Sequence, residues 1–501
     1  MQFKRSAIHL AQILVALAAL VAAPARAQTR AHVSVAWGKV VRISKTTATL
    51  QVVVNPLLRR DSPIHNQVFE ALRELNCDYV RFVPWLPYPK LGVAELAPPR
   101  AGKTSWNFSL IDPLTVDFLN ATAAQGHSVV LNFSTIPEWM FETPKPAAFP
   151  SDPDRVDWDY EQGTELRDPT MKQVADYYAR LVGWYANGGF TDEYGKWHAS
   201  GYHYPIAYWE VLNEVDSEHQ MSPEFYTRLY DAVVTAIHAV SPQTKFVGMA
   251  LSAPSSEPDF FQYFLNPKNH LPHTPLDMIS YHFYATPSAQ EPIAAWPYTF
   301  FAQADGFLNV VHYIESIRKR LSPSTRTDID ELGSILPYDT AAHMVRPIPH
   351  FYWNLSGAMY AYLYARLTRL GIDVVGESQM VGYPTQYPSV SMVNWTTGRP
   401  NARYWVLKLL HDNFAPGDKL VETGYGTSAI YAQAFITRDA KRKVLLINKR
   451  NRPAVISLPG AAGAHEDYVN QETGSTGIGS ANLVSDDVVL GGFEVTVVTL
   501  P

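Results

Sequence analysis

Short apolar runs and amphipathic stretches alternate along most of the chain. The apolar runs have the length of buried strands, about four to eight residues, and the stretches between them carry apolar residues at helical spacing. The predicted strands lie at residues 47–54, 78–85, 127–133, 206–214, 245–250, 277–284, 326–332 and 372–378. The predicted helices lie at residues 61–75, 112–125, 170–187, 222–240, 301–321 and 350–370.

This alternation predicts an α/β fold with parallel strands joined by crossover helices. About eight such units over residues 47–412 have the size of a (β/α)8 TIM barrel, for which roughly 250 residues or more is typical. The alternative is a doubly wound open sheet, which often carries a glycine-rich phosphate-binding turn after its first strand. No such turn follows residues 47–54, so the sequence favours the barrel.

The pattern changes after residue 412. Short β-like runs separated by turn residues replace the alternation, at residues 431–437, 443–448, 454–458, 487–490 and 494–500. They predict a C-terminal β-sandwich domain over residues 413–501. Another β-like run, at 33–43, precedes the first barrel strand, and we expect residues 28–46 to add a strand to the sandwich.

The first 27 residues predict a signal peptide. Lys4 and Arg5 form a basic start, an apolar stretch follows at 13–23, and Ala-Arg-Ala at 25–27 offers a cleavage site. The apolar stretch is too short for a membrane span and no second candidate follows, so we expect no membrane contact after cleavage. The single cysteine, Cys77, excludes an internal disulfide. An exported protein without disulfides suits a bacterial periplasm or the exterior of the cell.

Composition narrows the class of protein further. The chain is 47% hydrophobic and 18% charged, as in ordinary soluble proteins, and its net charge of −6 lacks the basic footprint of nucleic-acid binding. A metal-dependent hydrolase on this barrel needs clustered His and Asp ligands, and the first predicted strand has no His-x-His motif. We therefore expect neither a metal nor a cofactor. The oligomeric state is left open.

The fourth predicted strand carries the most informative polar residues. Its aromatic, apolar run ends in Asn213 and Glu214, and barrel enzymes hold their chemistry at the carboxyl ends of the strands. Glu210 lies four residues earlier, so the strand period predicts that it points to the same side as Glu214. A charge inside an apolar strand is unfavourable unless it is paired or used. Arg81, inside the second strand, is a candidate partner of Glu210 in a buried ion pair.

A second carboxylate, Glu331, ends the seventh predicted strand. The fourth and seventh strands of a barrel face each other, so Glu214 and Glu331 are placed to flank a glycosidic bond. A separation of about 5–5.5 Å leads to retention of configuration and about 6.5–9.5 Å to inversion, and sequence spacing does not choose between them. Asp328 and Asp330 alternate with Glu331 in sidedness and are the next carboxylates to consider.

These motifs resemble those of clan A, the retaining glycoside hydrolases built on (β/α)8 barrels. The features that carry the resemblance are Asn213 with Glu214, His282 with Tyr284, and Glu331 at the end of its strand. The order of these features along the barrel is more specific than any one of them alone.

Within the clan, residues 209–216 (Trp-Glu-Val-Leu-Asn-Glu-Val-Asp) are most similar to glycoside hydrolase family 39, the family of β-xylosidases and α-L-iduronidases. Residues 79–82 and 398–405 also resemble segments of that family, as does the layout with a terminal β-sandwich. Leu212 and Val215 depart from the usual Trp and Pro, which puts the substrate in question more than the chemistry.

The resemblance implies roles for the site residues. Glu214 would be the acid/base and Glu331 the nucleophile of a retaining glycosidase that acts on an oligo- or polysaccharide. Asn213 would contact the sugar 2-hydroxyl, Tyr284 would hold Glu331 ionised, and His282 would contact the sugar or the site wall.

Three further residues are expected to contact substrate. Glu377 ends the eighth strand and Trp139 follows the third, where a sugar-stacking ring is expected; Arg81 completes the set. The alternative function is a carbohydrate-binding barrel without catalysis. The presence of both carboxylates favours the enzyme.

Overall fold

The computed structural model of this chain describes residues 29–161, 163–337, 339 and 347–501. The predicted signal peptide lies outside these described residues. Among them, no helix is both long and apolar enough to cross a membrane.

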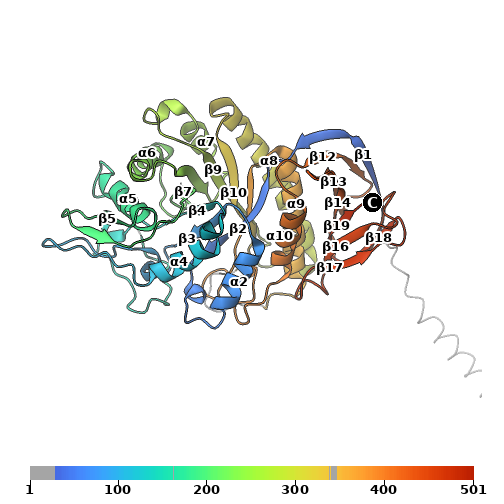
Figure 1. The fold of residues 1–501 in the computed structure, drawn as a ribbon, viewed down its shortest axis with the longest axis horizontal. Helices are drawn as coiled ribbons and strands as arrows, with labels where there is room; N and C mark the ends of the chain where they lie inside the picture. The colour runs from blue at the N-terminus through green and yellow to red at the C-terminus, as the bar shows by residue number, and fades with distance from the viewer. Residues whose placement is uncertain (1–28, 162, 338, 340–346) are drawn as a thin grey trace, which may run out of the picture.

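Eight parallel strands close into a barrel (Figure 1), which confirms the predicted fold class. In order around the barrel they are β2 (Thr47–Val53), β3 (Val80–Val83), β4 (Val129–Leu131), β7 (Tyr208–Val211), β8 (Lys245–Leu251), β9 (Met278–Ala285), β10 (Arg326–Ser334) and β11 (Val374–Glu377). Pairing of β11 with β2 closes the ring. Each of these strands overlaps one that the sequence predicts.

Helices surround the barrel. They are α2 (His65–Leu75), α3 (Pro89–Gly92), α4 (Ile111–Ala121), α5 (Lys172–Ala186), α6 (Pro223–Val240), α7 (Pro258–Phe264), α8 (Trp296–Leu321), α9 (Tyr352–Leu370) and α10 (Ala402–Asn413). Their ends follow local chemistry: Ser222 caps α6 through its side chain, Pro223 opens that helix, and Gly371 ends α9 with a φ of 87°. The short α7 was not predicted, because seven residues carry little helical periodicity.

The connections contain shorter elements. These are the hairpin β5 (Gly189–Thr191) and β6 (Trp197–Ala199), and the 3-10 helices η1 (Pro56–Leu58), η2 (Ala123–Gln125), η3 (Glu138–Met140), η4 (Pro267–Asn269), η5 (Ile293–Ala295) and η6 (Pro388–Val390).

A nine-stranded sheet forms the C-terminal domain. Its order is β17 (Gly479–Asn482), β16 (His465–Val469), β19 (Val495–Thr499), β14 (Arg442–Asn448), β13 (Ile430–Ile436), β12 (Lys419–Tyr425), β1 (Thr29–Ile43), β15 (Ala454–Ser457) and β18 (Asp487–Leu490). β1 pairs with β15 through residues 29–32 and with β12 through residues 33–43. The sheet therefore folds into two layers, which share a core that includes Val33, Val444 and Ile456.

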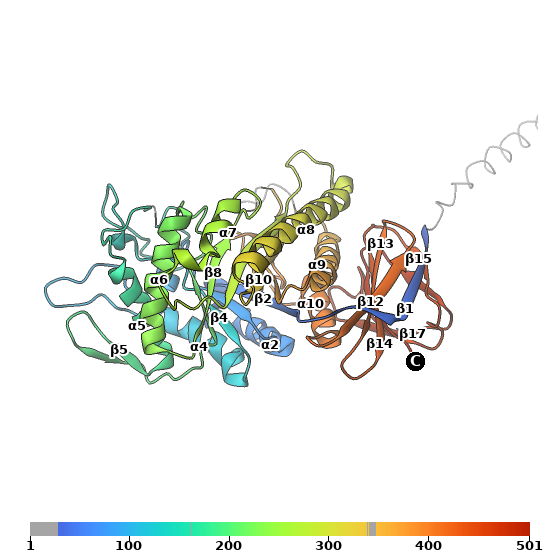
Figure 2. The ribbon, with the colours of Figure 1, turned by 90° about the horizontal axis from the view of Figure 1, so that it is seen from above.

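α9 and α10 lie between the barrel and the C-terminal sheet (Figures 1 and 2). α9 is buried on nearly every side, and its sequence is correspondingly apolar and aromatic around its whole circumference. Phe351, beside the start of α9, stacks on Phe493 of the sheet domain at a centroid distance of 5.9 Å. The contact between the domains is therefore continuous with the hydrophobic core of the barrel.

Candidate active site

A pocket of ≈100 Å³ opens at the carboxyl ends of the barrel strands. Glu214, Asn213, Tyr284 and Glu331 all line it, so the structure brings these predicted site residues together. The other lining residues are Gln51, Val53, Val83, Trp85, Ile335, Gln379, Tyr387 and Val390.

A bulge in β10 aims Glu331 at this pocket. Asp328 pairs with Ser280 of β9 and Glu331 with His282, so β10 takes three steps where β9 takes two. The same offset occurs against β11. With strict alternation, Asp330 and Glu331 would point to opposite faces of the strand. The extra residue of the bulge interrupts this alternation. Both carboxylates therefore contact Arg81 inside the barrel. The predicted opposite sidedness is therefore wrong here.

Glu214 follows β7 on a turn. The strand was predicted to reach residue 214, but it ends at Val211, and Leu212 and Glu214 adopt φ angles of 64° and 41°. The backbone N–H of Glu214 donates to the Ala250 carbonyl at 2.9 Å, which fixes the turn against β8. The strand period therefore does not relate Glu214 to Glu210.

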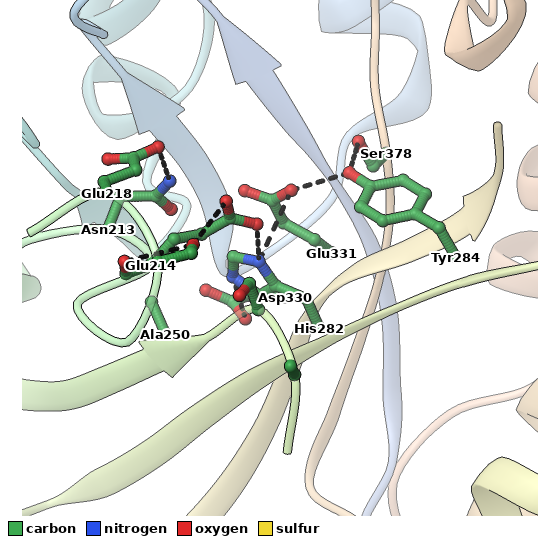
Figure 3. Close-up of polar contacts among 12 residues, drawn as sticks. Asn213, Glu214, Glu218, Ala250, His282, Tyr284, Asp330, Glu331 and Ser378 are labelled. Atoms are coloured by element: carbon green, nitrogen blue, oxygen red, sulfur yellow. Dashed lines mark hydrogen bonds and ion pairs between the residues drawn. The ribbon is translucent and has the colours of Figure 1, made fainter. Parts of the chain in front are cut away.

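Glu214, His282 and Glu331 form a compact group (Figure 3). One carboxylate oxygen of each glutamate and one ring nitrogen of His282 all lie within 4.8 Å of one another. His282 Nδ1 is 3.0 Å from Glu214 Oε1 and 3.6 Å from Glu331 Oε2. The side chain of Glu214 keeps 24% of its surface exposed, whereas that of His282 keeps 1%.

His282 carries a positive charge at neutral pH. Burial lowers its pKa, but the charges of Glu331 and Asp330 and the contact with Glu214 outweigh this and raise the pKa to about 9. The spacing of the three groups is also that of metal ligands. A metal ion would have to displace the proton of His282, whereas acid–base chemistry uses the group as it stands.

Glu331 is held as an anion. Burial alone would raise its pKa, but the charges of His282 and Arg81 and the hydroxyl of Tyr284 bring it below the usual value. Arg81 Nη1 donates to Glu331 Oε1 and the Tyr284 hydroxyl to Oε2, both at 2.6 Å. Ser378 Oγ lies 2.6 Å from the same tyrosine oxygen.

Arg81 is the centre of a buried polar network, with 1% of its side chain exposed. Its predicted ion pair with Glu210 is confirmed at 2.5 Å. The network extends further than predicted, to Asp330 at 2.9 Å, Asn213 at 2.7 Å and Gln51 at 2.8 Å. Arg81 does not line the pocket, and its contacts position other groups. Its contact with substrate stays a prediction.

Two more predicted substrate contacts lie elsewhere. Glu377 is fully buried, and its carboxylate accepts a hydrogen bond from Arg403 Nε at 2.9 Å. The carboxylate that was expected to face substrate is therefore paired with a residue of α10. Trp139 lines a separate groove of ≈930 Å³ between the loops after β3 and β4, with its indole N–H bonded to the Glu95 carbonyl at 2.8 Å. Neither residue borders the pocket of Glu214 and Glu331.

One partly buried carboxyl group beside the pocket was not predicted. Glu218 Oε1 accepts from Trp85 Nε1 at 2.6 Å and from Asn213 Nδ2 at 2.9 Å. Burial, followed by the charge of Glu214, raises the pKa of Glu218 well above its usual value. Its position four residues after Glu214 was the only signal in the sequence.

Comparison with known proteins finds the same fold among solved structures. No protein-family model matches the chain, and no curated protein matches it in sequence. Many solved structures are similar, and three examples that cover nearly the whole chain follow. A GH51 arabinofuranosidase from Xanthomonas axonopodis pv. citri has a TM-score of 0.63 at 12% identity and covers 95% of this chain and 100% of its own. An alpha-L-arabinofuranosidase from Thermotoga maritima has a TM-score of 0.60 at 13% identity, with 94% and 99% covered. A GH30 endoxylanase from Clostridium papyrosolvens has a TM-score of 0.56 at 16% identity, with 94% and 100% covered. At these identities the likeness establishes the shared fold.

Proposed function

We propose that this chain is a retaining glycoside hydrolase in which Glu214 is the acid/base and Glu331 the nucleophile. The observation that carries the proposal is their separation across the pocket, with carboxylate oxygens within 4.8 Å of each other. Retaining glycosidases hold their two carboxyl groups about 5–5.5 Å apart, and inverting ones about 6.5–9.5 Å, to leave room for a water molecule. The close approach of one oxygen of each group favours the shorter class.

The surroundings of the two carboxyl groups suit these two roles. Glu331 is ionised and its oxygens are fixed by Arg81 and Tyr284, so it is prepared to attack the anomeric carbon. Glu214 is partly exposed and takes part in few contacts, so it can deliver a proton to the leaving oxygen and later accept one from water. The positive charge of His282 lies between them and stabilises the ionised nucleophile.

Asn213 is placed to contact the substrate beside the two carboxyl groups. Its Oδ1 accepts from Arg81 and its Nδ2 donates one hydrogen to Glu218, which leaves one N–H for the pocket. A bond from this N–H to the sugar 2-hydroxyl would strengthen in the transition state.

The proposed substrate class rests on the similarity of this chain to other proteins. The resemblance of residues 209–216 to family 39, and the names of the similar structures, two arabinofuranosidases and an endoxylanase, both favour sugars of plant polysaccharides. We propose a β-xylosidase-like or related polysaccharide-degrading activity. We also propose that the enzyme is exported by way of its predicted signal peptide.

Azide rescue tests the two roles. Wild-type enzyme is first offered 4-nitrophenyl β-D-xylopyranoside, α-L-arabinofuranoside and β-D-glucopyranoside. With the substrate that is cleaved, Glu331→Ala should give a glycosyl azide of inverted configuration, and Glu214→Ala one of retained configuration. Asp330→Ala, a neighbouring carboxylate, should give no azide product.

Activity changes of about 10²–10⁴ are expected from loss of acid–base help, which is easily measured. The same stereochemistry from both variants would contradict the assignment. Binding of sugars without hydrolysis of any substrate would favour a carbohydrate-binding protein instead.

A further inference from the structure

Glu218 has no part in the proposed bond-making and bond-breaking steps, yet its carboxyl group lies beside the pocket and contacts two residues that line it. It does not line the pocket itself. Its backbone N–H donates to the Glu214 carbonyl at 2.8 Å, so it closes the turn that carries the proposed acid/base. The side chain then points toward Asn213 (Figure 3).

We propose that Glu218 is a positioning residue that fixes two walls of the pocket, the amide of Asn213 and the indole of Trp85. This inference rests on the proposed function and adds a residue to it. A single atom, Oε1, accepts both N–H groups, at 2.9 Å and 2.6 Å. Both of the residues that it holds line the pocket.

The amide of Asn213 is held from both ends. Arg81 donates to its Oδ1 at 2.7 Å, and Glu218 accepts from its Nδ2. A guanidinium has only donors, and the acceptor atom of Glu218 lies on the other side, so the amide has one favourable orientation. In that orientation its remaining N–H is available to a sugar hydroxyl. Without Glu218 the amide keeps its contact with Arg81 but can swing about it.

Trp85 is held in a similar way. Its ring meets Trp158 edge-on at a centroid distance of 5.4 Å and stacks against Tyr387 at 6.2 Å. These contacts hold the faces of the indole, and the bond to Glu218 fixes its rotation. Trp85 therefore presents a constant surface to the pocket.

The second oxygen of Glu218 indicates which substitution should be tolerated. Oε2 is buried and has no hydrogen-bond partner among the described residues. The function of the side chain therefore depends on Oε1 as an acceptor, and not on a negative charge. Glutamine keeps that acceptor and nearly the same shape, whereas alanine removes it.

The test compares substrates with and without the hydroxyl that Asn213 would contact. Wild type, Glu218→Gln, Glu218→Ala, Asn213→Ala and the double alanine variant are assayed on the aryl glycoside that the wild type cleaves and on its 2-deoxy analogue. Misplacement of a catalytic contact by about 1 Å can reduce the rate by about 10²-fold. We expect Glu218→Ala to lose roughly 10- to 100-fold in kcat/KM on the 2-hydroxyl substrate but only a few-fold on the 2-deoxy analogue.

The matched variants separate positioning from folding. Glu218→Gln should stay within about threefold of wild type. The double variant should lose much less than the two single losses combined, because both single changes remove the same contact of Asn213 and only the loss at Trp85 is added. Glu224→Ala, at an exposed acid in the first turn of α6, should change nothing. If Glu218→Ala folds poorly, Trp85→Phe removes one of the same hydrogen bonds from the other side and should raise KM.

Several outcomes would overturn the inference. Equal losses on both substrates, or additive losses in the double variant, would show that Glu218 does not act through Asn213. A Glu218→Gln variant as inactive as the alanine variant would show that the acid itself is needed. A wild type that cleaves no glycoside would refute the proposed function, whereas an active wild type with a fully active Glu218→Ala would refute this inference alone.

Discussion

Replacement of Arg81 by lysine separates the electrostatic contribution of the buried network from its contribution to stability. The guanidinium contacts five side chains at 2.5–2.9 Å, namely those of Glu210, Asp330, Glu331, Asn213 and Gln51. Lysine keeps the positive charge but offers three N–H donors from one atom, so at least two contacts are lost. Each hydrogen bond to a charged group contributes about 1.5–3 kcal/mol, so we expect Arg81→Lys to lower the free energy of unfolding by roughly 3–6 kcal/mol.

Activity should fall for a separate reason. With one of its two anchoring donors missing, Glu331 is less firmly placed and less strongly held as an anion. Loss of a single well-placed donor at an active site lowers kcat by about 10²–10³. Kinetics on the cleaved aryl glycoside, at a temperature where urea titration shows the variant folded, measures this loss without a contribution from unfolding.

The matched control is Arg318→Lys. Arg318 is also buried and makes a bidentate pair with Glu315 at 2.9 and 2.7 Å, but it lies on α8, outside the barrel. This variant should lose stability and keep kcat. If Arg81→Lys loses stability but keeps kcat within about threefold, or if Arg318→Lys loses as much activity, the argument that Arg81 prepares Glu331 is refuted.

Three further predictions concern groups around the network. Because the pKa of His282 is raised to about 9 from 6.5, its charged form stabilises the fold fully below pH 6.5, and that stabilisation, at most about 3 kcal/mol, is lost as pH rises through 9. Thermal unfolding from pH 6 to 10 should show this loss in wild type and not in His282→Gln; identical curves would contradict it. Tyr284→Phe removes the other donor to Glu331 and should reduce kcat by about 10- to 100-fold with little change in KM, whereas a change in KM alone would assign the tyrosine to substrate binding. Glu377→Gln leaves Arg403 with a neutral partner and should lower Tm but not alter KM. A raised KM would show that Glu377 contacts substrate, as the sequence predicted.

The architecture could be predicted from the sequence because its signals are local. Each barrel strand is an apolar run with its own boundaries, and the loss of helical periodicity after residue 412 marks the second domain. Glu214 and Glu331 could be chosen because each follows an apolar strand and the barrel places the carboxyl ends of its strands together.

The remaining details of the site depend on contacts between distant segments. The bulge in β10 is defined only against β9 and β11, so alternation within 326–332 alone gave the wrong side for Asp330 relative to Glu331. The eighth strand alone gave no partner for Glu377. Its partner, Arg403, lies on α10, so the ion pair depends on how that helix packs on the barrel. Arg81 was correctly paired with Glu210, but no pattern within one strand reveals a side chain that also reaches the fourth and seventh strand ends.

Trapping the covalent intermediate identifies the nucleophile. An aryl glycoside of the cleaved sugar, with fluorine in place of the 2-hydroxyl and a dinitrophenyl leaving group, slows hydrolysis of the glycosyl-enzyme more than its formation. Digestion and mass spectrometry of the inactivated enzyme then locate the sugar. We expect one fluorosugar on the peptide that contains Glu331, attached to its carboxylate. A label on Asp330, Glu214 or Glu218, or no label from an enzyme whose product has inverted configuration, would contradict this expectation.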